Sequence, residues 1–354
     1  MPNVILHYTR VNALVRAMIS RLLQPADWQR LLAANDAEDV LRQLGETRYA
    51  GRVQGLQRPN LAELERALRL ALLDAYDRLI DCLGSAPRRV IETLLSRQEV
   101  DNLKAILRAV IGHSPIEEAR DLLFPLGNYS QLPVEDLLRA ARPADTAGIL
   151  ADTLYGRVLR VPLERFHEEG SLFAVDVALD LDYYRRLWAD VLLLNGLDRR
   201  LARQLVGARY DLLNIDWLIR FRLLYHLSPQ EIFNYTIPYG YRMTDQIVQH
   251  AAAAPDLAGI IAELPDVYAT VLRGVEAAKA PIGEVEVRLQ RHLNRQARLA
   301  LVGYPFHIGE VIAYLWLRET EVHDLAVIAE GKRIGRPPEA ILGLLWGTTV
   351  PGVA

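Results

Sequence analysis

A helical segment that occurs three times constrains this chain more than any other feature. The first copy spans residues 94–109 and reads LLSRQEVDNLKAILRA. The second copy begins at Leu205 and the third at Ile312. The interval between copies is about 110 residues, which is longer than the repeat of a solenoid, so each copy marks a domain-sized unit. The recurrence predicts three related units that follow one another along the chain.

Each copy has the apolar spacing of an amphipathic helix, and each carries polar residues on the apolar side. The apolar face of the first copy, with a period of about 3.6 residues, is formed by Leu95, Leu103, Ile106, Leu107 and Val110. The polar residues on that side are Glu99 and Asn102, then Asp211 and Asn214, then Glu321 and Asp324. A carboxylate on an apolar face is costly unless it is paired or reaches water. We therefore expect one role repeated three times. The pairs either are buried and fix the packing of each unit, or surround a water-filled cavity that receives a partner.

The rest of the chain repeats in the same order, with short helices before two long ones. We expect the long helices at 60–83 and from residue 94 to about 112, at 172–194 and 199–227, and at 282–300 and 306–330. Two similar turns, FPLG ending at Gly127 and IPYG ending at Gly240, separate the units, which we place at 1–127, 128–240 and 241–354. A smaller pattern recurs as Thr47 with Tyr49, Thr153 with Tyr155, and Asp266 with Tyr268. No stretch shows the alternation of a strand, so the expected fold class is all-α.

Composition narrows the class of protein. The chain has 354 residues, of which 51% are hydrophobic and 24% charged, as in a globular protein. A net charge of −3 argues against a general nucleic-acid-binding protein. The single cysteine, Cys82, excludes an internal disulfide and fits a reducing compartment. The N-terminus lacks the layout of a signal peptide, and no apolar run approaches the ~20 residues that span a bilayer. We expect a soluble protein, or one held at a membrane through a partner.

A search for catalytic and cofactor motifs returns little. The sequence lacks a phosphate-binding G-x-x-x-x-G-K-[ST] loop and an H-E-x-x-H zinc motif. Glu164 and His167 have the spacing of one half of a di-iron site, but no second E-x-x-H occurs. His113 and His226, at the ends of the first two repeated helices, are explained by the negative helix C-terminus. We expect no catalytic residues, no cofactor and no metal.

One charge pattern remains. A basic stripe follows the helix expected at 282–300, and it consists of Arg288, Arg291, His292, Arg295 and Arg298. A solvated helix face is the simplest explanation. A contact with an acidic partner helix or with lipid headgroups is the alternative.

Four segments resemble those of a known family. They are RQEVDNLKAILR at 97–108, PFHIG at 305–309, ETEVHDLAVIA at 319–329, and the L-x-x-T-x-Y-like end of 41–49. Together they resemble the central-stalk C subunit of bacterial and archaeal V/A-type rotary ATPases, which corresponds to the d subunit of eukaryotic vacuolar enzymes. The resemblance covers nearly the whole chain. Three positions depart from the family's K-E-x-E-I-x-N-L-R-x-I-A helix: Arg318 stands at its start, Asp324 replaces Asn and Ala326 replaces Arg.

The resemblance implies a funnel of three similar helical domains with pseudo-threefold symmetry. Its narrow base would sit on the cytoplasmic face of the membrane proteolipid ring, and its open mouth would receive the coiled-coil shaft of the rotor. Such a protein is present in one copy, carries torque rather than chemistry, binds no nucleic acid and touches the membrane only through the ring. The implied process is hydrogen-ion or other ion transport coupled to ATP synthesis or hydrolysis.

Two other classes of protein compete with this interpretation. One is an all-α metal-dependent hydrolase or synthase that uses the carboxylates of Glu99, Asp211 and Glu321. The other is a helical scaffold unrelated to ATPases. A tightly bound metal would favour the first, and the absence of a shaft or ring protein among its partners would favour the second.

Overall fold

Helices account for the ordered structure, and capping residues set many of their ends. The computed structural model describes residues 2–56, 61–277 and 281–347, and within these ranges it contains helices and no β-strand. Asp36 accepts a hydrogen bond at 2.9 Å from the backbone N–H of Asp39 and so begins α3 (Ala37–Leu44). Ser228 and Glu231 form a reciprocal capping box at the start of α13 (Pro229–Tyr235). The all-α fold class is confirmed.

The chain divides into two compact units. One, which we call the continuous unit, is Arg88–Asp190. The other, which we call the split unit, is built from the two ends of the chain, Met1–Pro87 and Val191–Ala354. The long helix α6 (Ser85–Ile111) begins in the split unit and lies mostly in the continuous one.

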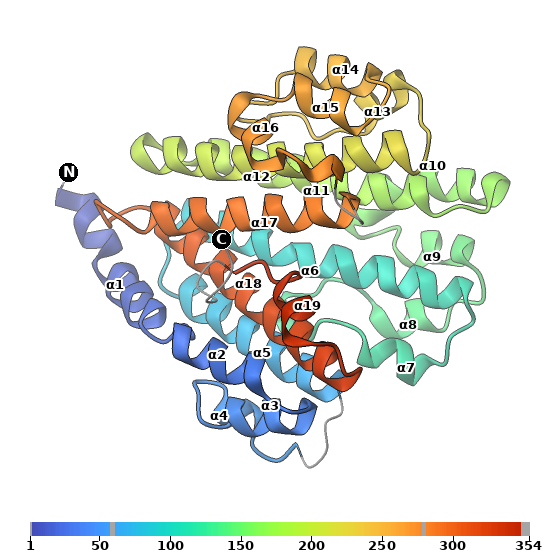
Figure 1. Cartoon of the computed structure of the whole chain (residues 1–354). Coiled ribbons are helices and arrows are strands. Elements are labelled where there is room, and N and C mark those ends of the chain that lie inside the picture. The colour runs from blue at the N-terminus through green and yellow to red at the C-terminus, as the bar shows by residue number, and fades with distance from the viewer. Residues whose placement is uncertain (1, 57–60, 278–280, 348–354) are drawn as a thin grey trace. The chain divides into compact units, whose positions relative to one another are not determined.

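Two long helices frame the continuous unit. Its elements after α6 are α7 (Ile116–Asp121), η1 (Gly127–Tyr129), α8 (Val134–Leu138), α9 (Pro143–Ile149), α10 (Leu154–Glu169) and α11 (Phe173–Leu193), the last of which ends in the split unit (Figure 1). Thr93 of α6 donates to Asp190 of α11 at 2.6 Å, and Arg97 of α6 donates to Asp180 of α11 at 2.7 Å. These bonds hold α6 and α11 together.

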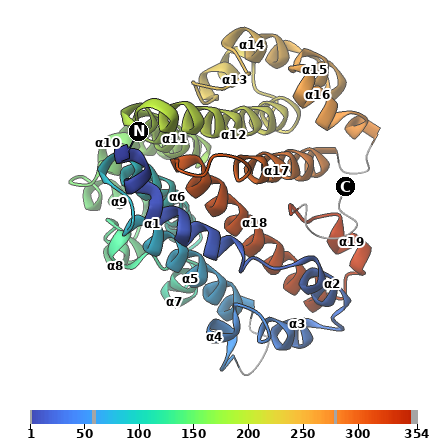
Figure 2. The same ribbon diagram turned by 90° about the vertical axis from the view of Figure 1, so that its left-hand side faces the viewer.

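Helix α18 is the centre of the split unit. The N-terminal part contributes α1 (Pro2–Ile19), α2 (Pro25–Ala33), α3, α4 (Ala50–Val53) and α5 (Leu61–Ile80). The C-terminal part contributes α12 (Gly196–Leu223), α13, α14 (Asp245–Ala253), α15 (Leu257–Glu263), α16 (Asp266–Leu272), η2 (Val275–Ala277), α17 (Pro281–Ala300), α18 (Ile308–Arg333) and α19 (Pro338–Leu342). Helix α18 packs against α1, α3 and α5 from one end of the chain and against α12, α17 and α19 from the other (Figure 2).

The two ends of the chain share one hydrophobic core. Trp28 and Leu31 of α2 are buried together with Leu325 and Ile328 of α18 and with Ile341 of α19. Burying a large apolar side chain contributes about 1.5–3 kcal/mol, so this cluster stabilises the contact between segments that are remote in sequence.

Several helix ends differ from the expected ones. Helix α10 spans Leu154–Glu169, a range for which no long helix was expected, and α12 ends at Leu223, earlier than the expected Leu227. His113 and His226 follow α6 and α12 with φ angles of 49° and 53°. A left-handed residue cannot continue a right-handed helix, so the same backbone feature ends both helices.

Candidate functional site

The polar residues on the apolar faces are all buried, and the first carboxylate is that of Glu99 in the continuous unit. Its side chain on α6 is 2% exposed. It accepts hydrogen bonds from the backbone N–H of Gln131, from the Ser130 hydroxyl at 3.1 Å and from the Tyr155 hydroxyl at 2.8 Å. The carboxylate therefore connects the long helix α6 to the short helices that follow it.

The second carboxylate, Asp211 of α12, has the same kind of surroundings. It accepts from the backbone N–H groups of Tyr241 at 2.9 Å, Arg242 at 2.7 Å and Met243 at 3.1 Å. The hydroxyl of Tyr268 donates to it at 2.7 Å. Burial raises the pKa of Asp211, while these four hydrogen bonds act in the opposite direction because they favour the charged form.

The third carboxylate, Glu321 of α18, makes equivalent contacts with the opposite end of the chain. It accepts from the backbone N–H of Leu23 at 2.7 Å and from the Tyr49 hydroxyl at 2.9 Å. These partners lie 298 and 272 residues away in the sequence. The guanidinium of the fully buried Arg318 also donates to Glu321. Glu321 therefore ties the C-terminal helix to the N-terminal segment.

The three tyrosines belong to the smaller recurring pattern in the sequence. Tyr155 and Tyr268 lie 56 and 57 residues after the carboxylates that they contact. The third tyrosine, Tyr49, instead lies 272 residues before the carboxylate of Glu321 that it contacts. Burial raises the pKa of all three tyrosines well above the usual range, so their hydroxyls keep their protons and act as donors.

The second member of each polar pair binds the backbone. Asn102 accepts from the N–H of Phe124 at 2.7 Å and donates to its carbonyl at 2.9 Å. Asn214 does the same with Ile237, at 2.7 and 2.8 Å. Both partners precede a proline in the FPLG and IPYG turns, which explains why those turns recur with the helices.

Asp324 differs because its backbone partners are two N–H donors, in addition to the ring nitrogen of His323 at 3.1 Å. The N–H groups of Trp346 and Gly347 donate to its carboxylate at 2.8 and 2.7 Å. A carboxylate accepts hydrogen bonds only, whereas an amide has one acceptor and one donor group. An aspartate at this position therefore suits partners that are both donors, whereas Asn102 and Asn214 each bind one donor and one acceptor.

The basic stripe on α17 is mostly engaged within the chain. Arg288 donates to Glu284 at 2.7 Å, Arg291 donates to the carbonyls of Leu345 and Leu342 at 3.0 and 3.1 Å, and Arg298 donates to Asn294 at 3.1 Å. The ring of His292 lies edge-on to Tyr268. Arg295 is the exposed member of the stripe.

Metal ligation has no candidate cluster among the residues that the structure describes. No group of three or more His, Cys, Asp or Glu side chains within these ranges is placed to hold a metal ion. The Glu99, Asp211 and Glu321 carboxylates instead accept from amide and hydroxyl donors of the chain itself. The side chain of His167 lies outside the described residues.

Sequence reasoning found both recurring patterns but missed that they contact each other. The signal was present in the nearly constant distance from Glu99 to Tyr155 and from Asp211 to Tyr268. It was hidden for Glu321, whose partners stand at the other end of the chain. Arg318, which joins Glu321 and Tyr49, was noted only as a departure from a family pattern.

A comparison with known families identifies the group of proteins to which the chain belongs. The chain belongs to the ATP synthase (C/AC39) subunit family, whose model matches residues 11–344. The resemblance drawn from the sequence is thereby confirmed. No described helix combines the length and the apolar character needed to cross a bilayer.

Similar proteins include C subunits of A-type ATP synthases from three organisms. The A-type ATP synthase C subunit of Methanothermobacter thermautotrophicus is 27% identical over 336 residues, which is 94% of this chain and 85% of the relative. The corresponding C subunit of Pyrococcus horikoshii is 28% identical over 342 residues, covering 96% and 90% of the two chains. That of Methanocaldococcus jannaschii is 25% identical over 347 residues, covering 96% and 86%.

Proposed function

We propose that this chain is the C subunit of a V/A-type rotary ATPase or ATP synthase, a non-catalytic part of the rotor. In this role it is a socket that couples the rotor shaft to the membrane proteolipid ring, so that torque passes between ATP chemistry and ion transport. The observation that carries the proposal is the family match over residues 11–344. Relatives named as A-type ATP synthase C subunits also align with this chain over 85–90% of their own length.

The proposal includes three related units, 1–127, 128–240 and 241–354, arranged as a funnel with pseudo-threefold symmetry. Its support is the repetition of one hydrogen-bond pattern in three places. In each place a buried carboxylate of a long helix accepts hydrogen bonds from a backbone N–H group and from a tyrosine hydroxyl of a short-helix segment. For Glu99 and Asp211 this segment comes next in the sequence, and for Glu321 it is the segment at the N-terminus. A three-membered ring of units, closed by Glu321 on the N-terminal segment, would produce this order.

Resistance to deformation is what a torque-carrying part requires, and the buried polar contacts suit that requirement. Leaving a buried donor or acceptor unsatisfied typically costs about 1–3 kcal/mol, and more for a charged group, so the segments that these contacts join separate rarely. We therefore assign the six polar residues to packing rather than to a cavity that meets the shaft, because each is 5% exposed or less.

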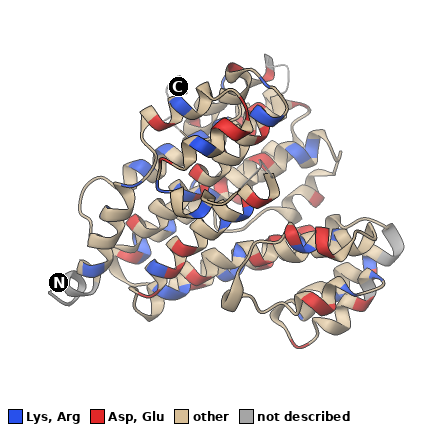
Figure 3. Cartoon of the chain, turned by 90° about the horizontal axis from the view of Figure 1, so that it is seen from below, with Lys and Arg blue, Asp and Glu red and all other residues tan. Residues whose placement is uncertain are grey.

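The expected partners are the coiled-coil subunits of the shaft and the proteolipid ring, with one copy of this chain per complex at the cytoplasmic face of the membrane. Positive and negative side chains are intermixed along the helices (Figure 3). Arg295 is exposed, so it is the member of the basic stripe that we assign to a contact with an acidic partner helix.

A pull-down with the tagged chain from its native membrane tests the assignment. We expect shaft subunits, proteolipid and ATP-hydrolysing subunits in the eluate, and no ATP hydrolysis by the purified chain alone. Arg295→Glu should weaken recovery of its partner, whereas Arg66→Glu, at an exposed position of α5, serves as the matched control.

Two outcomes would overturn the proposal. Recovery of partners that include no ATPase component would favour the unrelated scaffold. Turnover by the homogeneous chain that is lost in Glu321→Gln would favour the metal-dependent enzyme.

A further inference from the structure

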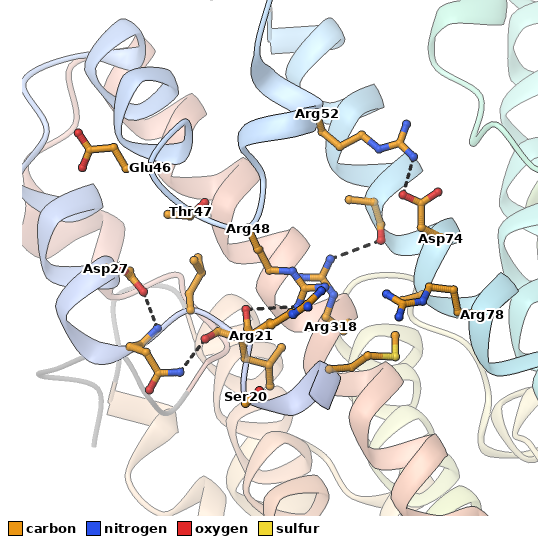
Figure 4. Close-up of a pocket in the computed structure, with 16 residues that line it drawn as sticks. Ser20, Arg21, Asp27, Glu46, Thr47, Arg48, Arg52, Asp74, Arg78 and Arg318 are labelled. Carbon is orange, nitrogen blue, oxygen red and sulfur yellow. Dashed lines mark hydrogen bonds and ion pairs between the residues drawn. The ribbon is translucent and has the colours of Figure 1, made fainter. Parts of the chain in front are cut away.

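A polar cavity lies in the split unit, and none of the three buried carboxylates belongs to its lining. Its volume is about 590 Å³, within the range of small-molecule sites. It is lined by the end of α1, the loop before α2, the segment from α3 to α4, and by α5 and α18 (Figure 4). Its walls therefore come from both ends of the chain.

Five guanidinium groups line this cavity, those of Arg21, Arg48, Arg52, Arg78 and Arg318. The acidic residues in its wall are Asp27, Glu46 and Asp74. The whole chain has a net charge of −3, so a positive excess at one place is not a consequence of composition.

The acidic residues in the wall already have partners. Asp74 pairs with Arg52 at 2.5 Å. Asp27 and Glu46 pair with Arg30, which is outside the lining, at 2.7 and 3.0 Å. Within the described ranges, no carboxylate lies within 4.0 Å of the guanidinium groups of Arg21, Arg48 or Arg78. Three positive charges thus face the cavity without an anionic partner.

The fourth relevant group is the buried Arg318. Its side chain is fully buried, and its terminal nitrogens donate to Tyr49, Glu321 and the carbonyl of Ala71. Its Nε–H is buried with no acceptor among the described residues. Arg318 belongs to the cavity wall, so the wall contains a buried guanidinium whose hydrogen-bonding groups are not all satisfied.

We propose that this cavity binds the phosphate group of an anionic ligand that carries more than one negative charge. Guanidinium groups bind phosphate oxygens through paired, charge-assisted hydrogen bonds. One carboxylate would compensate one of the unpaired arginines, whereas a polyphosphate can engage all three. The volume has room for such a ligand. The phosphate can come from a free polyphosphate or nucleotide or from an anionic lipid headgroup, and the experiment separates these sources.

Binding would join elements that are distant in the sequence. Arg21 follows α1, Arg48 lies between α3 and α4, and Arg78 lies at the end of α5 (Figure 4). A ligand held by all three stabilises the folded chain by an amount that grows with the logarithm of its concentration relative to its Kd. This inference does not depend on the proposed rotor function, because it concerns the isolated chain.

Calorimetric titration of the full chain with pyrophosphate and with ATP tests it, at about 0.15 M salt, where non-specific attraction is screened. Citrate is the carboxylate probe. Arg21→Ala combined with Arg78→Ala should weaken pyrophosphate or ATP binding by at least about tenfold. The matched control combines Arg10→Ala on α1 with Arg66→Ala on α5, since both residues are exposed and outside the cavity. A melting curve of each variant verifies that it is folded.

Saturable binding of pyrophosphate or ATP that the Arg21/Arg78 variant loses and the Arg10/Arg66 variant keeps supports a soluble ligand. Binding only to vesicles that contain cardiolipin, whose headgroup has two phosphate groups, and not to phosphatidylcholine vesicles, with the same loss in the Arg21/Arg78 variant, supports a lipid headgroup. The proposal is overturned if no phosphate probe binds, if both variants weaken binding equally, or if citrate binds as tightly as pyrophosphate.

Discussion

At the scale of single residues, the decisive fact is that a carboxylate can be fully buried when enough donors of the same chain surround it. Asp211 is 0% exposed, yet it accepts from three backbone N–H groups and a tyrosine hydroxyl. Glu321 reaches the same result with fewer amides because Arg318 supplies a full positive charge. Different sets of hydrogen-bond donors therefore stabilise a buried carboxylate at equivalent positions.

The Arg318–Glu321 pair predicts a large effect of one substitution. Glu321→Gln should lower the free energy of unfolding by about 3–5 kcal/mol, because it leaves a buried guanidinium without its counter-ion. Glu330→Gln is the matched control, since Glu330 pairs with Arg333 on the same helix at the surface. The control should have a much smaller effect, because solvent screens an exposed ion pair. Urea unfolding of both variants measures the difference, and equal losses would contradict a structural role for the buried pair.

The contacts of Asp324 predict that replacing it with asparagine, the family's usual residue, lowers the stability of this chain. In Asp324→Asn, one of the two N–H donors, Trp346 or Gly347, loses its acceptor, at a cost of about 1–3 kcal/mol. The indole of Trp346 stacks on His323 with ring centres 3.4 Å apart, so its fluorescence reports whether this segment stays docked. A variant with unchanged unfolding and unchanged tryptophan emission would show that the second hydrogen bond is unimportant.

At the scale of elements, the loops matter because they bring backbone donors to the long helices. Gly240 closes the IPYG turn, and a Cβ at this position would lie 2.3 Å from the Asp211 carboxylate and 2.8 Å from the Met243 carbonyl. The turn can therefore approach α12 only because residue 240 has no side chain. Gly127 occupies the corresponding turn for another reason, since its φ of 55° favours glycine.

This contact predicts different outcomes for two glycine substitutions in the split unit. Gly240→Ala should destabilise the chain, because the loop must move away from Asp211 and break its hydrogen bonds. Gly283→Ala on α17 meets no atom within 4 Å and should be neutral or stabilising by about 0.4–1 kcal/mol. Thermal unfolding distinguishes them, and a Gly240→Ala protein as stable as the Gly283→Ala protein would be inconsistent with the close approach.

The start of α18 predicts a pH dependence. Burial lowers the pKa of His307, with the nearby Asp198 carboxylate acting against it. Below its unfolded value of about 6.5, the unfolded chain binds the proton more readily than the folded one. The stability that this residue contributes is therefore present above about pH 6.5 and is lost as the pH falls through the folded pKa. Urea unfolding from pH 7.5 downward should show a smaller loss in His307→Gln than in the parent, and parallel curves would refute this assignment.

At the scale of the whole molecule, the split unit owes its existence to contacts between the two chain ends. Trp28 and Ile341 share its core, and Glu321 accepts from Leu23 and Tyr49. The same type of contact in the continuous unit, between Glu99 and Tyr155, is local by comparison.

Hydrogen exchange of the full chain tests whether these contacts couple the segments that they join. Glu321→Gln should lower amide protection in residues 20–50 and in α18 together, while residues 130–155 stay protected. Glu99→Gln should have the opposite pattern. Loss of protection confined to the substituted helix in each variant would mean that the carboxylates do not connect the segments.

The sequence by itself determined the helical class, the recurrence at three places and the six polar residues, because helical periodicity and capping are local properties. Family membership was also readable, since its motifs extend along the chain. Only the tertiary structure decided which donor meets which carboxylate, because hydrogen bonds such as that of Tyr49 to Glu321 join residues 272 positions apart. It also decided that Arg21, Arg48 and Arg78 surround one cavity. The physical reason is that folding brings remote charges together, and neither periodicity nor composition records that proximity.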